Sequence, residues 1–240
     1  AGGSLNSSVV LVWSPDGKRF AHSTYLQTTI RVWDPSTRET VRTLEGHGQP
    51  LRSLAWSADG KRLASVGDDG SVKVWDVSSG KKVFDFPYYV KPEANRTQVR
   101  PNASATLSWC RDGKRLAVAG EDEEIKVWDV DARKEVVTLQ GRPSEKDIHD
   151  LTCAVAWSPN GKRLASTSPD GTFLLWDTAT WQEVLILRLA SAGPFRQGDD
   201  RPGLGGTLAW SPDGQQLAFF GGGGSVTIWD ATPEESKLGQ

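Results

Sequence analysis

Hydrophobic and polar residues alternate over short stretches along the chain, and turn-forming residues separate these stretches. Between residues 51 and 86, the segment LRSLAW is followed by a Ser-Ala-Asp-Gly turn, and the segment KRLAS by Asp-Asp-Gly. The alternating segment SVKVW ends at Asp76, and a Ser-Ser-Gly turn then precedes the segment KVFDF. Alternation between clusters of Gly, Pro, Ser and Asp is typical of β-strands joined by tight turns. This part of the chain therefore predicts four consecutive strands in a meander.

The same unit occurs five times, and tryptophans mark each copy. The copies read LVWSPDGKRFAHSTYLQTTIRVWD, LAWSADGKRLASVGDDGSVKVWD, LSWCRDGKRLAVAGEDEEIKVWD, VAWSPNGKRLASTSPDGTFLLWD and LAWSPDGQQLAFFGGGGSVTIWD. Two tryptophans lie 20 residues apart in the first copy and 19 apart in the others, which explains all of the 11 except Trp181. The distance between copies varies from 42 to 53 residues, so the variation lies outside the shared unit. This self-similarity indicates a repeat architecture.

Each copy predicts a small sheet that needs neighbours to cover its apolar faces. Sheets stacked around an axis cover one another and bury their tryptophans between them. The predicted fold is therefore all-β, a β-propeller of five four-stranded blades whose last blade lacks a clear outer strand. The units from first to third strand are expected at residues 9–34, 51–76, 105–129, 152–177 and 206–230. Residues 1–8 are expected to be a linker or tag remnant, and residues 231–240 a C-terminal tail.

The two ends of the chain raise the question of how the propeller closes. An arc of blades that stays open exposes apolar sheet faces and edges, and both favour association. Three outcomes stay open: the chain is part of a longer propeller, several chains complete one another, or five blades close alone. We expect self-association into a homo-oligomer.

The repeated unit resembles the WD40-repeat family and is similar to the repeats of bacterial WD40 proteins. The resemblance rests on Trp-Ser-Pro-Asp-Gly-Lys-Arg-Leu-Ala-Ser, then Asp-Gly, then Val-Trp-Asp, and covers residues 9 to about 230. It implies a hydrogen-bond network of His, Ser or Thr, Asp and Trp inside a blade, with a structural role. The positions that match this network are His47, Ser65, Asp69 and Trp75 in the second copy, and Ser166, Asp170 and Trp176 in the fourth.

The remaining copies depart from this network, so we expect it to be complete in the second copy alone, or in the second and fourth. The fourth copy offers His149, one residue closer to its tryptophan than the second copy has it. At the serine position the other copies carry Val118, His22 and Phe219.

A catalytic alternative exists, because His47, Ser65 and Asp69 are also the residue types of a hydrolase triad. The serine lacks the Gly-x-Ser-x-Gly turn that exposes a nucleophile, so the structural interpretation is favoured. We expect no enzymatic activity, no metal site and no cofactor.

Composition and charge mainly exclude kinds of partner and kinds of site. The formal net charge is -2, which argues against nucleic acid or an anionic membrane as the main partner. No apolar run approaches the roughly 18 residues that a membrane span needs. Cys110 and Cys153 make no disulfide framework and no metal motif, which fits a cytoplasmic protein.

The variable parts are where a specific function is expected. Three connections between the outer strand of one copy and the inner strand of the next are long, and in a propeller they emerge on one face. Two of them carry aromatic and arginine residues of the types that dominate protein interfaces: Tyr88, Tyr89, Arg96, Arg100, Phe195, Arg196 and Arg201. The sequence favours a non-catalytic scaffold that binds a protein or peptide. An excised or engineered propeller piece that only self-assembles, and a propeller enzyme, are the alternatives.

Overall fold

The structure is a computed structural model in which five antiparallel sheets follow one another along the chain. It describes residues 10–24, 27–88, 105–120, 124–141, 154–168, 172–188, 207–220 and 226–231. These residues form 19 strands and no helix. Four sheets have four strands and the last has three, and the strands in each sheet follow chain order. We call the sheets blades 1 to 5; the prediction of an all-β fold of five meanders is confirmed.

The strand bounds agree with the alternating segments of the sequence. Blades 1 and 2 contain β1 (Val10–Trp13), β2 (Phe20–Ser23), β3 (Thr29–Asp34), β4 (Glu39–Glu45), β5 (Leu51–Trp56), β6 (Arg62–Gly67), β7 (Ser71–Asp76) and β8 (Lys81–Pro87). Blades 3 and 4 contain β9 (Thr106–Trp109), β10 (Arg115–Ala119), β11 (Glu124–Asp129), β12 (Lys134–Gln140), β13 (Val155–Trp157), β14 (Arg163–Thr167), β15 (Thr172–Asp177) and β16 (Glu183–Arg188). Blade 5 contains β17 (Thr207–Trp210), β18 (Gln216–Phe220) and β19 (Val226–Asp230).

The turn between the first and second strands of a blade is built by its own side chains. In blade 1, the Ser14 hydroxyl donates to Asp16 at 2.5 Å, and the same carboxylate accepts the Lys18 backbone N–H at 3.0 Å. Gly17 has φ of 68°, in the left-handed region that glycine tolerates best. Blade 3 has Cys110 where the other blades have this serine, which accounts for that buried free thiol.

The turn between the third and fourth strands also repeats. In blades 1 to 4 the register shifts by one residue just before the second tryptophan, which is a β-bulge. A residue with positive φ follows in each turn, and it is glycine only in blade 2: the four are Arg38, Gly80, Arg133 and Trp181. Trp181, the tryptophan outside the repeat pattern, packs edge-on against Trp157 with 6.0 Å between ring centroids.

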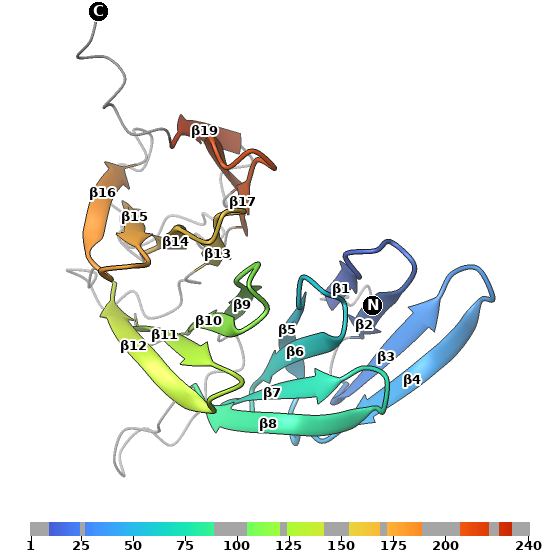
Figure 1. The fold of residues 1–240 in the computed structure, drawn as a ribbon. Helices are drawn as coiled ribbons and strands as arrows, with labels where there is room; N and C mark the ends of the chain where they lie inside the picture. Colours follow the sequence, from blue (N-terminus) through green and yellow to red (C-terminus); the bar gives the residue numbers. More distant parts are fainter. Residues whose placement is uncertain are drawn as a thin grey trace, which may run out of the picture.

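The hydrophobic core is divided among the junctions between successive blades. One cluster of buried residues lies between blades 1 and 2, one between 2 and 3, one between 3 and 4, and one between 4 and 5. Figure 1 shows the sheets following one another around an arc, with blade 1 (blue) and blade 5 (red) on either side of its open part. The described residues therefore form a propeller arc that they do not close into a ring.

The last blade has no fourth strand among the described residues. Residues 1–9 and 232–240 lie outside them, so the expected linker and tail stay predictions.

Candidate functional site: the blade 2 network and the blade faces

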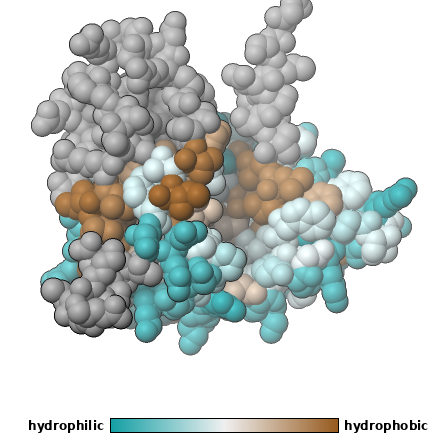
Figure 2. Space-filling model, turned by 90° about the horizontal axis from the view of Figure 1, so that it is seen from above, coloured by the Kyte–Doolittle hydropathy of each residue, from teal (hydrophilic) through white to brown (hydrophobic). Residues whose placement is uncertain are grey.

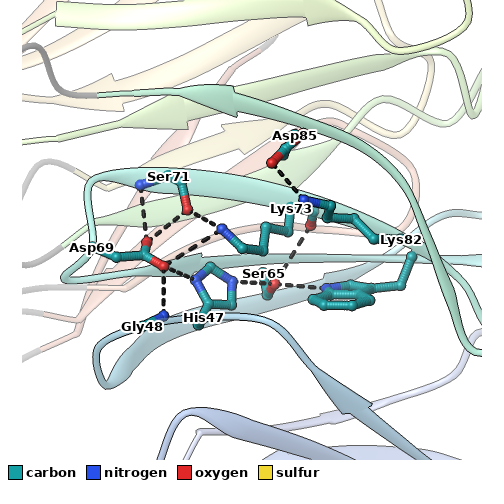
Figure 3. Close-up of polar contacts among 9 residues, drawn as sticks. His47, Gly48, Ser65, Asp69, Ser71, Lys73, Lys82 and Asp85 are labelled. Atoms are coloured by element: carbon teal, nitrogen blue, oxygen red, sulfur yellow. Dashed lines mark hydrogen bonds and ion pairs between the residues drawn. The ribbon is translucent and has the colours of Figure 1, made fainter.

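The polar network of blade 2 joins the segment before β5 to strands β6 and β7 (Figure 3). His47 Nδ1 lies 2.9 Å from Asp69 Oδ2, and His47 Nε2 lies 2.7 Å from Ser65 Oγ. The Trp75 indole N–H donates to the same serine oxygen at 2.8 Å. The structure thus brings together the four residues that the sequence singles out in this copy.

The direction of the proton donors follows from Asp69. Its carboxylate also accepts the backbone N–H of Gly48 at 3.0 Å, and the backbone N–H and hydroxyl of Ser71 at 3.1 and 2.6 Å. An ionised carboxylate only accepts, so the His47 Nδ1–H donates to Asp69; in the neutral imidazole, Nε2 then accepts the Ser65 hydroxyl proton. Each polar side-chain group of the network then has a partner, as buried polar groups require.

The electrostatics of Asp69 support an ionised network. Burial raises the pKa of this carboxyl, but hydrogen bonds from His47 and Ser71 outweigh burial and hold the pKa well below its usual range. The Lys73 ammonium lies 2.5 Å from the Ser71 hydroxyl and 3.5 Å from Asp69. The carboxylate is therefore charged at neutral pH and shared by several donors.

The same geometry argues against a hydrolase triad. Ser65 is completely buried, and so is the His47 side chain. The Ser65 oxygen already binds both His47 and Trp75. A nucleophile must reach a substrate carbonyl, and this serine faces the interior of a sheet stack. The arrangement can hold three segments of a blade together, but it offers no surface for a substrate.

The other blades carry reduced versions of the network. In blade 4 the Trp176 indole N–H donates to Ser166 Oγ at 3.0 Å, while Asp170 and His149 lie outside the described residues. In blade 1 the Trp33 indole N–H donates to His22 Nε2 at 2.9 Å. The aromatic nitrogen of His22 thus replaces the serine oxygen.

Blades 3 and 5 have no such acceptor at the serine position. In blade 3 this position is Val118, and the Trp128 indole nitrogen is buried without a hydrogen-bond partner among the described residues. Its ring instead stacks on Phe86 with 4.2 Å between centroids. In blade 5 the position is Phe219, which packs edge-on against Phe173.

The first tryptophan of a blade makes a hydrogen bond that the sequence does not predict. The indole N–H of Trp56 donates to the backbone carbonyl of Val12, at 3.2 Å, in the preceding blade. Trp109 and Trp210 donate to the equivalent carbonyls of Ala55 and Ala156, both at 3.1 Å. At three of the four junctions, the tryptophan of one blade therefore binds the first strand of the blade before it.

An arginine reinforces two of the four junctions. The Arg19 guanidinium donates to the Gly60 carbonyl at 3.2 Å and lies 5.4 Å from the centre of the Trp56 ring. Arg115 takes the same position over Trp157, at 4.8 Å. A guanidinium over an indole face is a favourable cation–π contact.

The terminal blades leave opposite faces uncovered. On blade 1, the incoming face carries the apolar residues Leu11, Trp13, Phe20 and Trp33, and also His22 and Arg31. The equivalent faces of blades 2 to 5 pack against the preceding blade. Leu11 and Trp13 are 51% and 55% exposed, whereas the equivalent Trp56 is 8% exposed.

On blade 5, the uncovered side is the outgoing face, which consists of Ala209, Ala218, Phe220, Val226 and Ile228. Val226 and Ile228 are each 60% exposed. Figure 2, which views the molecule from above, shows hydrophobic residues gathered in separate patches on the surface.

Of the seven residues suggested as partner contacts, only Tyr88 lies within the described residues. Tyr88 is 6% exposed and belongs to the core between blades 2 and 3, so the expectation that it contacts a partner is wrong. Its backbone N–H donates to the Gly70 carbonyl at 3.1 Å, which continues the end of β8 and turns the ring inward. The other candidates lie outside the described residues: Tyr89, Arg96, Arg100, Phe195, Arg196 and Arg201.

Comparison with known families settles the relationship. The family described as "WD domain, G-beta repeat" matches residues 3–34, 38–76, 102–129, 134–177 and 206–230, more than half of the chain. The chain belongs to the WD40-repeat family. Each match covers the first three strands of one blade, and the second and fourth matches also include the outer strand of the blade before. The blade 2 network lies in the second match.

Individual WD40 relatives match over part of the chain. Coronin-7 from Rattus norvegicus is 40% identical over 103 residues, which is 42% of this chain and 10% of the relative. Nuclear distribution protein PAC1 from Arthroderma benhamiae is 31% identical over 135 residues, 48% of this chain and 28% of the relative. The periodic tryptophan protein 2 homolog from Schizosaccharomyces pombe is 29% identical over 113 residues, which is 47% of this chain and 12% of the relative. The chain therefore spans well under two thirds of these relatives.

WD40 proteins generally act as scaffolds for protein interactions. Within the described residues, no helix is long and apolar enough to cross a membrane.

Proposed function

We propose that this chain is a non-catalytic scaffold that binds a protein or peptide through the long connections on one face of the arc. The observation that carries the proposal is topological. Strands β8 and β9, β12 and β13, and β16 and β17 each join an outer strand to the next inner strand, and each pair is separated by at least 14 residues. The equivalent connection between β4 and β5 has only five.

The chemistry of these connections supports the same proposal. The strand ends that they join all lie at the same end of their meanders. Two of them contain aromatic and arginine residues suited to hot spots: Tyr89, Arg96, Arg100, Phe195, Arg196 and Arg201. The blade 2 network and the four apolar junctions stabilise the frame that presents them. The two cysteines, which make no disulfide framework, favour a cytoplasmic location.

A displayed library of random peptides tests this function. We expect the chain to select peptides whose binding weakens at least about tenfold when Arg96 and Arg100, or Arg196 and Arg201, are replaced by Ser, because hot-spot residues dominate binding energy. Lys18→Ser and Lys61→Ser in turns between first and second strands serve as the matched control. Failure to select any peptide, or peptides indifferent to all four arginines, would contradict the proposal.

We also propose a second property, self-association, which the exposed incoming and outgoing faces favour. Contiguous exposed apolar surface is typical of interaction sites. A unit that only self-assembles, with no other partner, is the alternative function; it predicts assembly without any peptide binding.

A further inference from the structure

We infer that a pocket between blades 1 and 2 binds the carboxylate of an acidic side chain of a partner protein. The pocket has a volume of about 240 Å³, several times the roughly 30 Å³ that one water molecule occupies in the liquid. Its lining comes from both blades and consists of Arg19, Gly60, Lys61, Asp76, Val77 and Ser78.

The pocket lies at the end of the blades opposite to the long connections. Gly60 and Lys61 belong to the turn between β5 and β6, and Val77 and Ser78 to the turn between β7 and β8. In a meander these two turns lie at one end, whereas β8 leaves towards β9 from the other end. A ligand here therefore goes beyond the partner binding proposed above.

An arginine follows the turn between the first and second strands in each of blades 1 to 4, and it borders the junction with the next blade. In blades 2 to 4 this arginine pairs with a carboxylate; the pairs are Arg62 with Asp131, Arg115 with Asp112, and Arg163 with Asp177. In blade 1 it is Arg19, which has no ion pair within the described part of the chain. Its guanidinium donates one N–H to the Gly60 carbonyl, so its other N–H groups are available to a carboxylate.

Two aspartates of blade 1 lie near Arg19 but are held by their own turns. Hydrogen bonds from Ser14 and Ser36 lower the pKa of the carboxyl groups of Asp16 and Asp34, and the Arg19 charge makes a smaller contribution. In blade 3, where Cys110 replaces the serine of the first turn, the equivalent aspartate binds the arginine instead. The serine of blade 1 therefore helps to leave its arginine without a carboxylate.

The junction between blades 2 and 3 shows how a carboxylate fills this place. Asp131 in blade 3 and Ser78 in blade 2 occupy equivalent positions, three residues after the second tryptophan. Asp131 reaches back to Arg62 of the preceding blade at 2.7 Å, whereas the shorter Ser78 donates to Asp76 of its own turn at 2.7 Å. The pocket thus lies between Arg19 and the residue whose counterpart supplies the carboxylate in the next junction.

The charges around the pocket favour an anion. Arg19 and Lys61 line it, and the Arg42 guanidinium donates twice to the Ser78 carbonyl, at 2.6 and 3.1 Å. Asp76 is the acidic residue of the lining, but hydrogen bonds from the two serine hydroxyls of its own turn hold the pKa of its carboxyl at about 2. The equivalent aspartate of blade 3 does not prevent the ion pair of that junction. A guanidinium prefers planar anions such as carboxylates, which can accept two parallel N–H groups.

The exposure of the pocket indicates an acidic side chain on a protein rather than a small free acid. Lys61 and Ser78 are exposed, and ion pairs at exposed sites are weak by themselves. A carboxylate carried by a polypeptide gains further contacts from the residues around it. The internal example, Asp131, is itself a side chain presented by a turn.

A nine-residue peptide of alanine and serine with blocked ends and one central aspartate is the probe, and the same peptide with asparagine is its control. NMR titration of the full chain, labelled with ¹⁵N at arginine and tryptophan, follows the Arg19 Nε–H and the Trp56 indole N–H, over which Arg19 stacks. We expect the aspartate peptide to shift both signals to saturation and the asparagine peptide to bind at least about tenfold more weakly, because a charge-assisted hydrogen bond is lost. Absence of any shift, or equal binding of both peptides, would overturn the inference.

Two substitutions close this site and open its counterpart. Ser78→Asp supplies the carboxylate from within the chain and is expected to weaken binding of the aspartate peptide at least about tenfold. Asp131→Ser is expected to make the Arg62 Nε–H respond to the same peptide. Ser36→Asp, the same change in the equivalent turn of blade 1, is the matched control and should bind like the wild type. Full binding by Ser78→Asp, or an unresponsive Arg62 in Asp131→Ser, would contradict the equivalence of the two junctions.

Arg19→Gln tests the anchor itself. Blade 5 has Gln216 at this position, so the fold accommodates glutamine there, and circular dichroism should match that of the wild type. The Trp56 signal in this variant should show peptide binding weakened at least about tenfold. Binding that depends on Arg96 and Arg100 but not on Arg19 would assign the peptide to a long connection and overturn the inference without affecting the proposed function.

A third peptide identifies the source of the carboxylate. It contains only alanine and serine, and its single carboxylate is its free C-terminus. We expect it to bind more weakly than the aspartate peptide, because the example at Asp131 is a side chain. Equal or tighter binding would assign the pocket to chain termini and overturn the choice of an acidic side chain.

Discussion

Single tryptophan side chains connect the blades in two ways at once. Trp109 is buried against the neighbouring blade, and its indole N–H reaches the Ala55 carbonyl. Trp157 is equally buried, but its indole nitrogen has no partner among the described residues. The pair therefore separates the contribution of packing from that of the hydrogen bond.

Replacing each of these tryptophans by Phe measures the difference. Trp109→Phe loses ring volume and a hydrogen bond, whereas Trp157→Phe loses ring volume and removes an unsatisfied donor. We expect Trp109→Phe to lower the free energy of unfolding by about 1 kcal/mol more than Trp157→Phe, the typical net value of such a bond. Denaturant unfolding of both variants measures this. Equal losses would argue that the indole-to-carbonyl bonds contribute nothing.

Asp69 makes stability depend on pH. Because the pKa of its carboxyl in the folded chain lies below the unfolded value of about 3.9, the charged form stabilises the fold above that pH. This contribution is lost as the pH falls towards the folded pKa. Asp69→Asn removes the charge and is expected to lower the free energy of unfolding at pH 7 by about 1 to 3 kcal/mol.

The pH profile of Asp69→Asn distinguishes this role from simple packing. Between about pH 5 and pH 3, where unfolded carboxylates titrate, the wild type should lose more stability than Asp69→Asn. Asp85→Asn, which removes an exposed partner of Lys82, is the control and should follow the wild type. Parallel profiles for the wild type and Asp69→Asn would contradict the account.

At the scale of strands and turns, the repeated unit tolerates variation at one strained position. The turn after the third strand needs a left-handed residue, and three of the four blades supply it without glycine. Arg133 has φ of 53°, a conformation that costs a side chain with a Cβ about 1 kcal/mol or more.

Glycine substitution at this turn tests the cost of the strain. Arg133→Gly is expected to raise the free energy of unfolding by up to about 1 kcal/mol, because the relief of strain exceeds the added entropy of the unfolded chain. The reverse change, Gly80→Ala, should lower it by a similar amount, since Gly80 has φ of 72°. Thermal melting of both variants measures these changes. A loss of stability in Arg133→Gly would show that the left-handed conformation of Arg133 is not strained.

At the scale of the whole molecule, the sequence predicts the strands and turns well because these depend on local chemistry. Asp16-Gly17 and Asp69-Gly70 mark their turns by residue type, and His47, Ser65 and Trp75 match a known pattern. The bond from Trp56 to Val12 is not predictable in the same way, because its acceptor is a backbone carbonyl that any residue carries. The burial of Tyr88 is hidden for a similar reason, since it follows from the pairing of its backbone with Gly70.

The two end blades bear on the proposed self-association. Four apolar junctions hold the five blades together, and apolar side chains stay exposed at Leu11 and Trp13 in blade 1 and at Val226 and Ile228 in blade 5. If the scaffold self-associates as proposed, several linked binding faces would strengthen capture of a partner.

The mass of the unmodified chain in solution tests this account most directly. One chain has a mass of 26.1 kDa. Light scattering after size-exclusion chromatography is predicted to give a mass at least twice that of one chain. The mass should fall to that of a single chain in Trp13→Glu and in Ile228→Glu, which place a charge on an exposed face of an end blade, but not in Val184→Glu, at an exposed position of β16. A uniform species of 26.1 kDa from the unmodified chain would contradict it.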